Sequence, residues 1–268
     1  MSKTLEQRLG DAKEVLDQVD AALRRRPTSM PIDVTDSFKK VVAFGAEIPH
    51  WIGLLKSREA AMGLLSRLEN TVEEEDCVSL FSAPLKYQHV RFIGVQAYVT
   101  TTWALADRIT RIVGHVLCTP EAGCNGAFPP QLVSHFVQKE RAKKTAALFG
   151  SMKRTFGWPI CVSYAIRNHF VHDGGRFSSF DLFEGLSPAS AFRVSVEGWK
   201  RIEDTVSNTY HVDPSCQRAA GSWPTNPRED LRVVLSVCER EMDDALGILL
   251  GSACRSLLAH VGFMLGED

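Results

Sequence analysis

Apolar side chains recur at spacings of three and four residues along most of this chain, and this pattern restricts its possible folds more than any other sequence feature. Such spacing places side chains on one face of an α-helix, because the helix has about 3.6 residues per turn. In the N-terminal segment, the apolar positions that share a face are Leu5, Leu9, Ala12, Leu16, Val19 and Leu23. The pattern predicts an all-α protein whose amphipathic helices each bury one face.

Prolines and capping residues divide the rest of the chain into further helical segments. Asp36 or Ser37 can cap a segment that Pro49 interrupts. Pro159 suits a first helical turn, which would follow a connection over residues 150–159. The remaining helices are predicted over residues 51–69, 86–117, 132–149, 160–172 and 228–265.

A small β-hairpin is expected before the last helix. Residues 192–196 alternate apolar and polar side chains, which is typical of a strand, and residues 201–212 are predicted to pair with them. A cap at Thr225 or Asn226 would then start the last helix.

The chain has 268 residues, of which 44% are hydrophobic and 24% charged, so it can bury a sizeable core. We expect residues 1–268 to form a single helical domain. In this domain, residues 1–70 would be an N-terminal helical extension and residues 86–265 the core.

Charge and cysteine content limit the classes of function. The formal net charge is −1, so phosphate binding would depend on a local cluster of Lys and Arg. The seven cysteines are odd in number and form no C-x-x-C pair, which argues against a disulfide framework and a cysteine zinc ribbon. The N-terminus is charged and amphipathic, unlike a signal peptide, and no apolar run is long enough to span a bilayer. These features predict a cytoplasmic protein that does not bind membranes.

Residues 165–175 carry the strongest chemical signal, because Arg-Asn-x-x-x-His is followed there by two glycines. Asn168 and His172 are four residues apart and therefore lie one turn apart on the same helix face. The long side chain of Arg167 can reach the same place. Glycine readily adopts the left-handed conformation at a helix C-terminus, so the helix is predicted to end beside His172.

These three side chains fit the cleavage of a phosphodiester bond. Arginine is a permanent cation whose planar fork matches phosphate oxygens, and histidine can take or give a proton near neutral pH. In RNA, the 2′-hydroxyl can be the internal nucleophile, so such a site needs no metal and no other cofactor. We expect Arg167 to stabilise the phosphate, His172 to transfer the proton, and Asn168 to orient His172 or bind a phosphate oxygen.

The motif is much rarer by chance than its presence in this chain would suggest, given the amino-acid composition. With 20 arginines and 8 histidines, chance gives about 0.6 Arg-x4-His pairs (20 × 8 / 268), and a second pair does occur at Arg255 and His260. That pair lies in an apolar helix with no glycine terminator, and we interpret it as coincidence. Requiring one of the five asparagines directly after the arginine multiplies the expected number by 5 / 268, which gives about 0.01.

Arg167, Asn168 and His172, which close a helix in an all-α domain, resemble the signature of the HEPN superfamily. The resemblance is strongest over residues 167–175 and extends more loosely over residues 86–265. It implies a bundle of four or five helices and a metal-independent endoribonuclease that leaves a 2′,3′-cyclic phosphate. It also implies a homodimer in which two motifs share one composite site.

Some members of the HEPN superfamily are toxins or antiviral-defence proteins. The resemblance therefore implies that this chain has an antitoxin or a defence-system partner. Toxin members regulated by nucleotidyl transfer have a tyrosine two residues after the motif histidine. This chain has Gly174 at that position, so that form of regulation is not expected.

A basic stretch precedes the motif helix and could guide an RNA backbone. A solvated helix face explains the same charges equally well. The candidate RNA-binding residues are Lys139, Arg141, Lys143, Lys144, Lys153 and Arg154, with Arg176 on the other side of the motif.

Other interpretations stay open. Cations stabilise the dipole at a helix C-terminus, so Arg167 and His172 can be purely structural. A HEPN-like module can also bind RNA, nucleotide or protein without catalysis. His172-Asp173 resembles a pair in metal-dependent phosphohydrolases, but no second His-rich helix accompanies it. His169 points to another helix face, which predicts a structural or solvent-facing role.

Two further groups of residues are weaker candidates for a functional site. Tryptophans more often anchor a core than form a base-stacking platform, and the chain has Trp51, Trp103, Trp158, Trp199 and Trp223. Incomplete sets of metal-ligand types occur at His115, Cys118 and Cys124, and at His211, Asp213 and Cys216.

Overall fold

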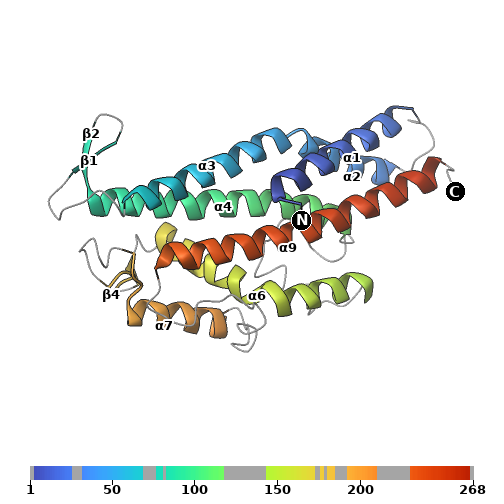
Figure 1. Cartoon of the computed structure of the whole chain (residues 1–268). Helices are drawn as coiled ribbons and strands as arrows, with labels where there is room; N and C mark the ends of the chain where they lie inside the picture. Colours follow the sequence, from blue (N-terminus) through green and yellow to red (C-terminus); the bar gives the residue numbers. More distant parts are fainter. Residues whose placement is uncertain are drawn as a thin grey trace. The chain divides into compact units, whose positions relative to one another are not determined.

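The architecture comes from a computed structural model of the whole chain, shown in Figure 1. The structure describes residues 3–25, 32–68, 77–80, 83–117, 143–172, 176–177, 180–184, 192–209 and 230–265. Statements about the structure concern these residues.

The described part of the chain is mainly helical, which confirms the all-α prediction. The helices are α1 (Leu5–Arg25), α2 (Ile32–Gly45), α3 (Ile48–Arg67), α4 (Tyr87–Leu117), α6 (Lys143–His172), α7 (Val196–Asp204) and α9 (Leu231–Leu265). A π-helical turn, η4 (Thr205–Thr209), continues α7. In α1, the buried residues are Leu5, Leu9, Ala12, Leu16 and Val19, as the spacing predicts.

The chain divides into two compact units. One comprises residues 1–54, 105–150 and 243–268, and the other residues 55–104 and 151–242. Helices α3, α4, α6 and α9 contribute residues to both. These limits do not coincide with residues 1–70 and 86–265, and the assignment of a HEPN-like bundle to residues 86–265 stays a prediction.

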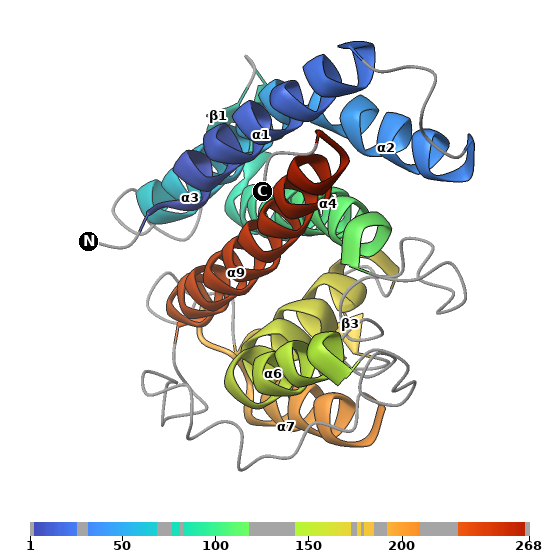
Figure 2. The same ribbon diagram turned by 90° about the vertical axis from the view of Figure 1, so that its right-hand side faces the viewer.

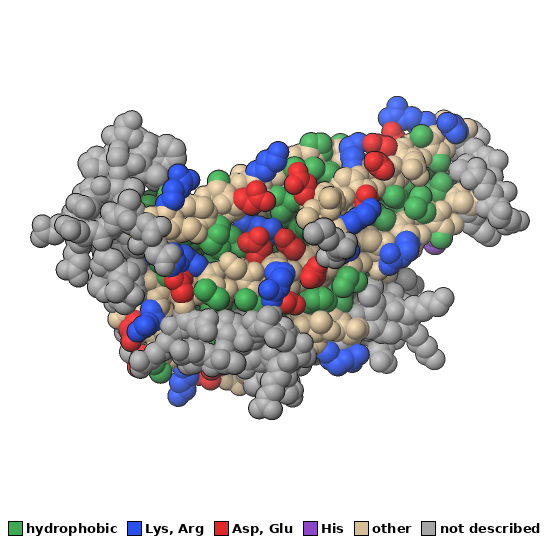
Figure 3. Space-filling view, in the orientation of Figure 1, with side chains coloured by type: hydrophobic (Ala, Val, Ile, Leu, Met, Phe, Trp, Pro, Cys, Tyr) green, Lys and Arg blue, Asp and Glu red, His purple; other side chains and the backbone are tan. Residues whose placement is uncertain are grey.

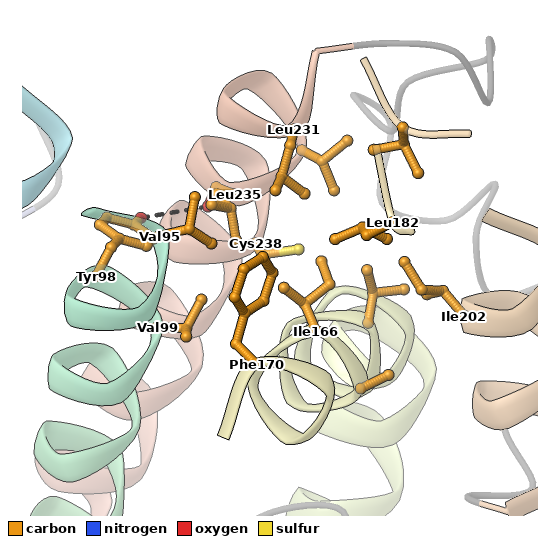
Figure 4. Close-up of a cluster of buried hydrophobic side chains, with 14 of the residues drawn as sticks. Val95, Tyr98, Val99, Ile166, Phe170, Leu182, Ile202, Leu231, Leu235 and Cys238 are labelled. Carbon is orange, nitrogen blue, oxygen red and sulfur yellow. Dashed lines mark hydrogen bonds between the residues drawn. The ribbon is translucent and has the colours of Figure 1, made fainter. Parts of the chain in front are cut away.

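The second unit contains a large cluster of buried side chains, part of which is drawn in Figure 4. Val95 and Val99 of α4, Phe170 of α6, and Leu235 and Cys238 of α9 meet there. Removal of this much apolar surface from water is the main force that holds the unit together. The end of α6 that carries the motif is therefore anchored in the core.

Helix α6 corrects one prediction. Residues 150–159 were expected to connect two helices, but α6 is continuous and Pro159 lies inside it. A proline inside a helix costs about 3 kcal/mol, because it lacks an N–H group and its ring crowds the preceding turn. All residues from 156 to 163 are buried, so packing on every side of the helix offsets this cost.

Helix α7 corrects a second prediction. The hairpin expected over residues 192–212 is wrong in its second strand, because residues 196–209 are helical. Arg193 and Val194 instead form isolated antiparallel bridges with Asp230 and Phe183. Ser195 caps α7 through a hydrogen bond from the Gly198 backbone N–H, at 2.9 Å. Trp199, Ile202 and Val206 follow at spacings of three and four and are buried, so a helical signal was present. Figures 1 and 2 show α7 beside α6.

Short antiparallel pairs occur elsewhere. Strands β1 (Cys77–Leu80) and β2 (Ala83–Lys86) pair with each other, and the sequence analysis missed them. Strands β3 (Arg176–Phe177) and β4 (Phe180–Asp181) form a second pair shortly after α6.

The last helix starts three residues later than predicted. Asp230 caps it, because its carboxylate accepts a hydrogen bond of 2.8 Å from the Arg232 backbone N–H. The expected caps, Thr225 and Asn226, lie outside the described residues. By length and composition alone, residues 231–262 of α9 could cross a membrane, with a mean hydropathy of 1.4. A core helix of a soluble protein passes the same test, and many α9 side chains belong to the buried core.

Candidate active site

The surface of α6 changes character over its last two turns. Ala165, Ile166, His169 and Phe170 stay buried, but a single stripe of the helix emerges from the core. Its members lie at spacings of three and four and are Tyr164, Arg167, Asn168, Val171 and His172. The first three are half-buried and the last two exposed. The three motif residues therefore share one accessible face at the end of the helix.

The guanidinium of Arg167 contacts the other two residues of the motif. Its Nη1 atom lies 2.8 Å from Oδ1 of Asn168 and 3.2 Å from Nε2 of His172. An arginine can only donate, so Nε2 accepts, and the proton of the neutral imidazole is assigned to Nδ1. The structure thus brings together the three residues that the sequence nominated, with one nitrogen bonded to both partners.

The contact of Asn168 refines its expected role. Asn168 was predicted to orient His172 or to bind a phosphate oxygen. Its carbonyl oxygen accepts from Arg167, so it holds the guanidinium that also contacts His172. The amide therefore restricts the arginine, whose long side chain is otherwise the most mobile of the three.

The buried face of the same turns fixes the site to the core. Phe170 is 2% exposed, and its ring lies 5.6 Å from that of Phe92 and 6.3 Å from that of Phe183. The guanidinium of Arg91 stacks on Phe183, with 4.0 Å between its central carbon and the ring centroid. Nothing in the spacing of the sequence indicated this second, buried arginine near the aromatic cluster.

His169 is buried, with its ring edge-on to that of Phe170. It lies on a different face of α6 from the three motif residues. Of the two roles predicted for it, structural or solvent-facing, its burial agrees with the structural one.

The basic stretch is described only in part. Lys139 and Arg141 lie outside the described residues. Lys143, Lys144 and Lys153 belong to α6, and Arg176 begins β3, but the description does not extend to their side chains. Arg154 is exposed on α6. On the face drawn in Figure 3, basic and acidic side chains are interspersed.

The second Arg-x4-His pair differs in geometry from the motif. Arg255 of α9 donates to Oγ of Ser252, at 3.1 Å, one turn towards the N-terminus of the helix and away from His260. Arg167 instead bonds forward, to His172. Arg255 and His260 are both exposed, so they form a natural control for the motif.

A buried polar network in the same unit escaped the sequence analysis. Arg58 is buried, and its Nη2 atom lies 3.1 Å from Oε1 of Glu239. The hydroxyl of Tyr98 donates to the other carboxylate oxygen. Burial, and next the charge of Glu239, raise the pKa of Tyr98, so its hydroxyl stays protonated. These residues come from α3, α4 and α9, and no local pattern links them.

Those of the remaining candidates that the structure describes add no second site. Within the residues described, no three His, Cys, Asp or Glu side chains are grouped as metal ligands. The side chain of His115 falls outside the description, as do Cys118, Cys124, His211, Asp213 and Cys216. The tryptophans that the structure describes are buried: Trp51, Trp103, Trp158 and Trp199. Trp223 lies outside the described residues.

In comparisons of the chain with known proteins, no protein-family model, curated protein or solved structure matched it. The assignment of function therefore depends on the site itself.

Proposed function

We propose that this chain is a metal-independent endoribonuclease of the HEPN type, which cleaves RNA through attack by the 2′-hydroxyl. One observation supports this most directly. At the exposed end of α6, Arg167 bonds Asn168 at 2.8 Å and His172 at 3.2 Å. A fixed cation beside an imidazole that can accept a proton supplies two of the groups that this reaction needs from a protein.

In the proposed reaction, the phosphate of bound RNA takes over the hydrogen bonds of Arg167. This releases the Nε2 lone pair of His172, which removes the proton of the 2′-hydroxyl. The 2′-oxygen forms a bond to phosphorus and the bond to the 5′-oxygen breaks, which leaves a 2′,3′-cyclic phosphate. Arg167 stabilises the negative charge that develops on the phosphate oxygens, and Asn168 keeps the guanidinium in place.

The proposed reaction also uses a second copy of the chain, which supplies the general acid. The leaving 5′-oxygen needs a proton, and each chain offers one motif histidine. In a homodimer with a composite site, the first His172, neutral, would be the base, and the second His172, in its protonated form, would be the acid that gives its proton to the leaving 5′-oxygen. The basic residues near α6 would guide the RNA backbone into this site. A toxin or defence effector in the cytoplasm, controlled by an antitoxin or defence-system partner, is the setting we propose.

Cleavage of RNA by the purified full-length chain tests the proposal. Loss of general acid–base catalysis lowers rates by about 10²- to 10⁴-fold, so His172→Ala should reduce cleavage by that amount without unfolding the protein. Arg167→Ala should cause a comparable loss. Arg255→Ala and His260→Ala remove the same residue types from α9 and should cleave like the wild type. Equal cleavage by wild type and His172→Ala would refute the proposal.

A non-catalytic binding module is the second candidate. The contacts of Arg167 and His172 lie at a helix C-terminus, where cations stabilise the helix in any case. This function predicts that RNA is retained without cleavage, and that retention depends on the basic stretch rather than on His172. Loss of cleavage with a chelator would instead favour a metal-dependent phosphohydrolase over both.

A further inference from the structure

The accessible stripe of α6 begins with an aromatic ring that the proposed reaction does not use. Tyr164 precedes Arg167 by three residues and Asn168 by four, so all three lie on one side of the helix. The rise of the helix separates Tyr164 from Arg167 by about 4.5 Å along the axis. An exposed stripe of an ordinary surface helix carries mostly charged residues. This one carries tyrosine, asparagine, valine and histidine with a single permanent cation.

The ring of Tyr164 rests on a rigid support. Its centroid lies 4.8 Å from that of Trp103, with 60° between the ring planes. The indole N–H of Trp103 donates to Oγ of Ser163, at 3.2 Å, and both of these residues are buried. Trp103 is thus held by the core, and it in turn restricts Tyr164. An aromatic side chain that is already ordered loses little conformational entropy when a ligand stacks on it.

We infer that Tyr164 stacks an unpaired base of single-stranded RNA, next to the phosphate that Arg167 binds. The inference rests on the proposed function of this site and names its substrate class. Bases stack on tyrosine when they are splayed out of a strand, whereas the bases of an A-form duplex stack on one another. A ring about one helical turn from a phosphate-binding arginine therefore selects unpaired RNA.

Charge supports the same substrate class. Between residues 164 and 172, Arg167 is the one Lys or Arg of the helix, so phosphate contacts within this stripe add little to the affinity that the neighbouring basic residues supply. Stacking supplies affinity that depends weakly on base identity, because every base has a π-face. The site would accordingly prefer single strands with little sequence selectivity.

Binding measured without cleavage tests the inference. The full-length His172→Ala chain is titrated with a labelled single-stranded RNA and with an abasic strand of the same length, which keeps the phosphates and lacks the bases. Tyr164→Leu, added to this background, keeps an apolar contact with Trp103 and removes the aromatic face. Loss of a stacked base costs about 5- to 140-fold in affinity. We expect that loss for the ordinary strand and less than a twofold change for the abasic strand.

Tyr164→Phe retains the ring and should bind the ordinary strand within about threefold of the parent chain, because the contact is stacking. Unfolding curves check that all variants are folded. Equal affinity of the parent and Tyr164→Leu for the ordinary strand would overturn the inference, as would equal losses for both strands. Cleavage of RNA that does not depend on Tyr164 would overturn the stacking role and leave the proposed reaction standing. If the wild-type chain binds RNA through Tyr164 but does not cleave it, the proposed reaction is refuted and the stacking role stands.

Discussion

Phe170 and Val171 are neighbours in the motif segment, and the structure predicts opposite consequences for their truncation. Phe170 is 2% exposed and packs between the rings of Phe92 and Phe183. Truncation of a buried phenylalanine to alanine removes its transfer free energy and leaves a cavity, at a cost of about 3–5 kcal/mol. Val171 is 36% exposed, so Val171→Ala should change the free energy of unfolding by about 0.5 kcal/mol or less.

Urea unfolding, followed by circular dichroism and by tryptophan fluorescence, measures both changes. Phe170→Ala should lower the midpoint strongly, and Val171→Ala should leave it nearly unchanged. The reasoning depends on which face of α6 meets the core, and adjacent residues point about 100° apart around the helix. A Val171→Ala variant that loses as much stability as Phe170→Ala would refute this placement of the helix, and with it the exposed position of His172.

Two further predictions concern other parts of the chain. Ser195→Ala removes the acceptor for the Gly198 backbone N–H and should lower the free energy of unfolding by about 1 kcal/mol, measured in the same urea assay; an unchanged midpoint would show that the cap contributes nothing. Burial, and next the carboxylate of Asp11, raise the pKa of the Cys254 thiol from its ordinary value of about 9 to about 11. Because the folded-state pKa is the higher one, this stabilisation is complete below pH 9 and is lost as the pH rises towards 11. Cys254→Ala should therefore show a shallower loss of stability across that range than the wild type, and parallel curves would contradict the assignment.

The long helices could be predicted closely because their signal is local. The predicted ranges 5–23, 86–117 and 228–265 correspond to α1, α4 and α9, with ends that differ by at most three residues. Each has enough turns for the apolar spacing to be unambiguous. The end of α6 at His172 was predicted for the same reason, from residues next to one another in the chain.

The errors occurred where packing outweighs a local preference. Pro159 predicted a helix start, but the buried surroundings of residues 156–163 keep α6 continuous through it. The alternation at residues 192–196 predicted a strand, and the spacing of Trp199, Ile202 and Val206 was overlooked although it is helical. A short alternating run fits a strand and the turn before a helix equally well. Here Arg193 and Val194 make isolated bridges to Asp230 and Phe183, which lie in other segments of the chain, and α7 starts directly afterwards.

The sequence by itself determined the all-α class and placed Arg167, Asn168 and His172 together at a helix end, because these follow from the periodicity of consecutive residues. The tertiary structure decided which face of that end is open. It buried His169 and Phe170, assigned Asn168 to Arg167, and supported Tyr164 with a tryptophan from another helix. Contacts between residues far apart in the chain depend on which surfaces meet when the helices pack, and no local spacing encodes that.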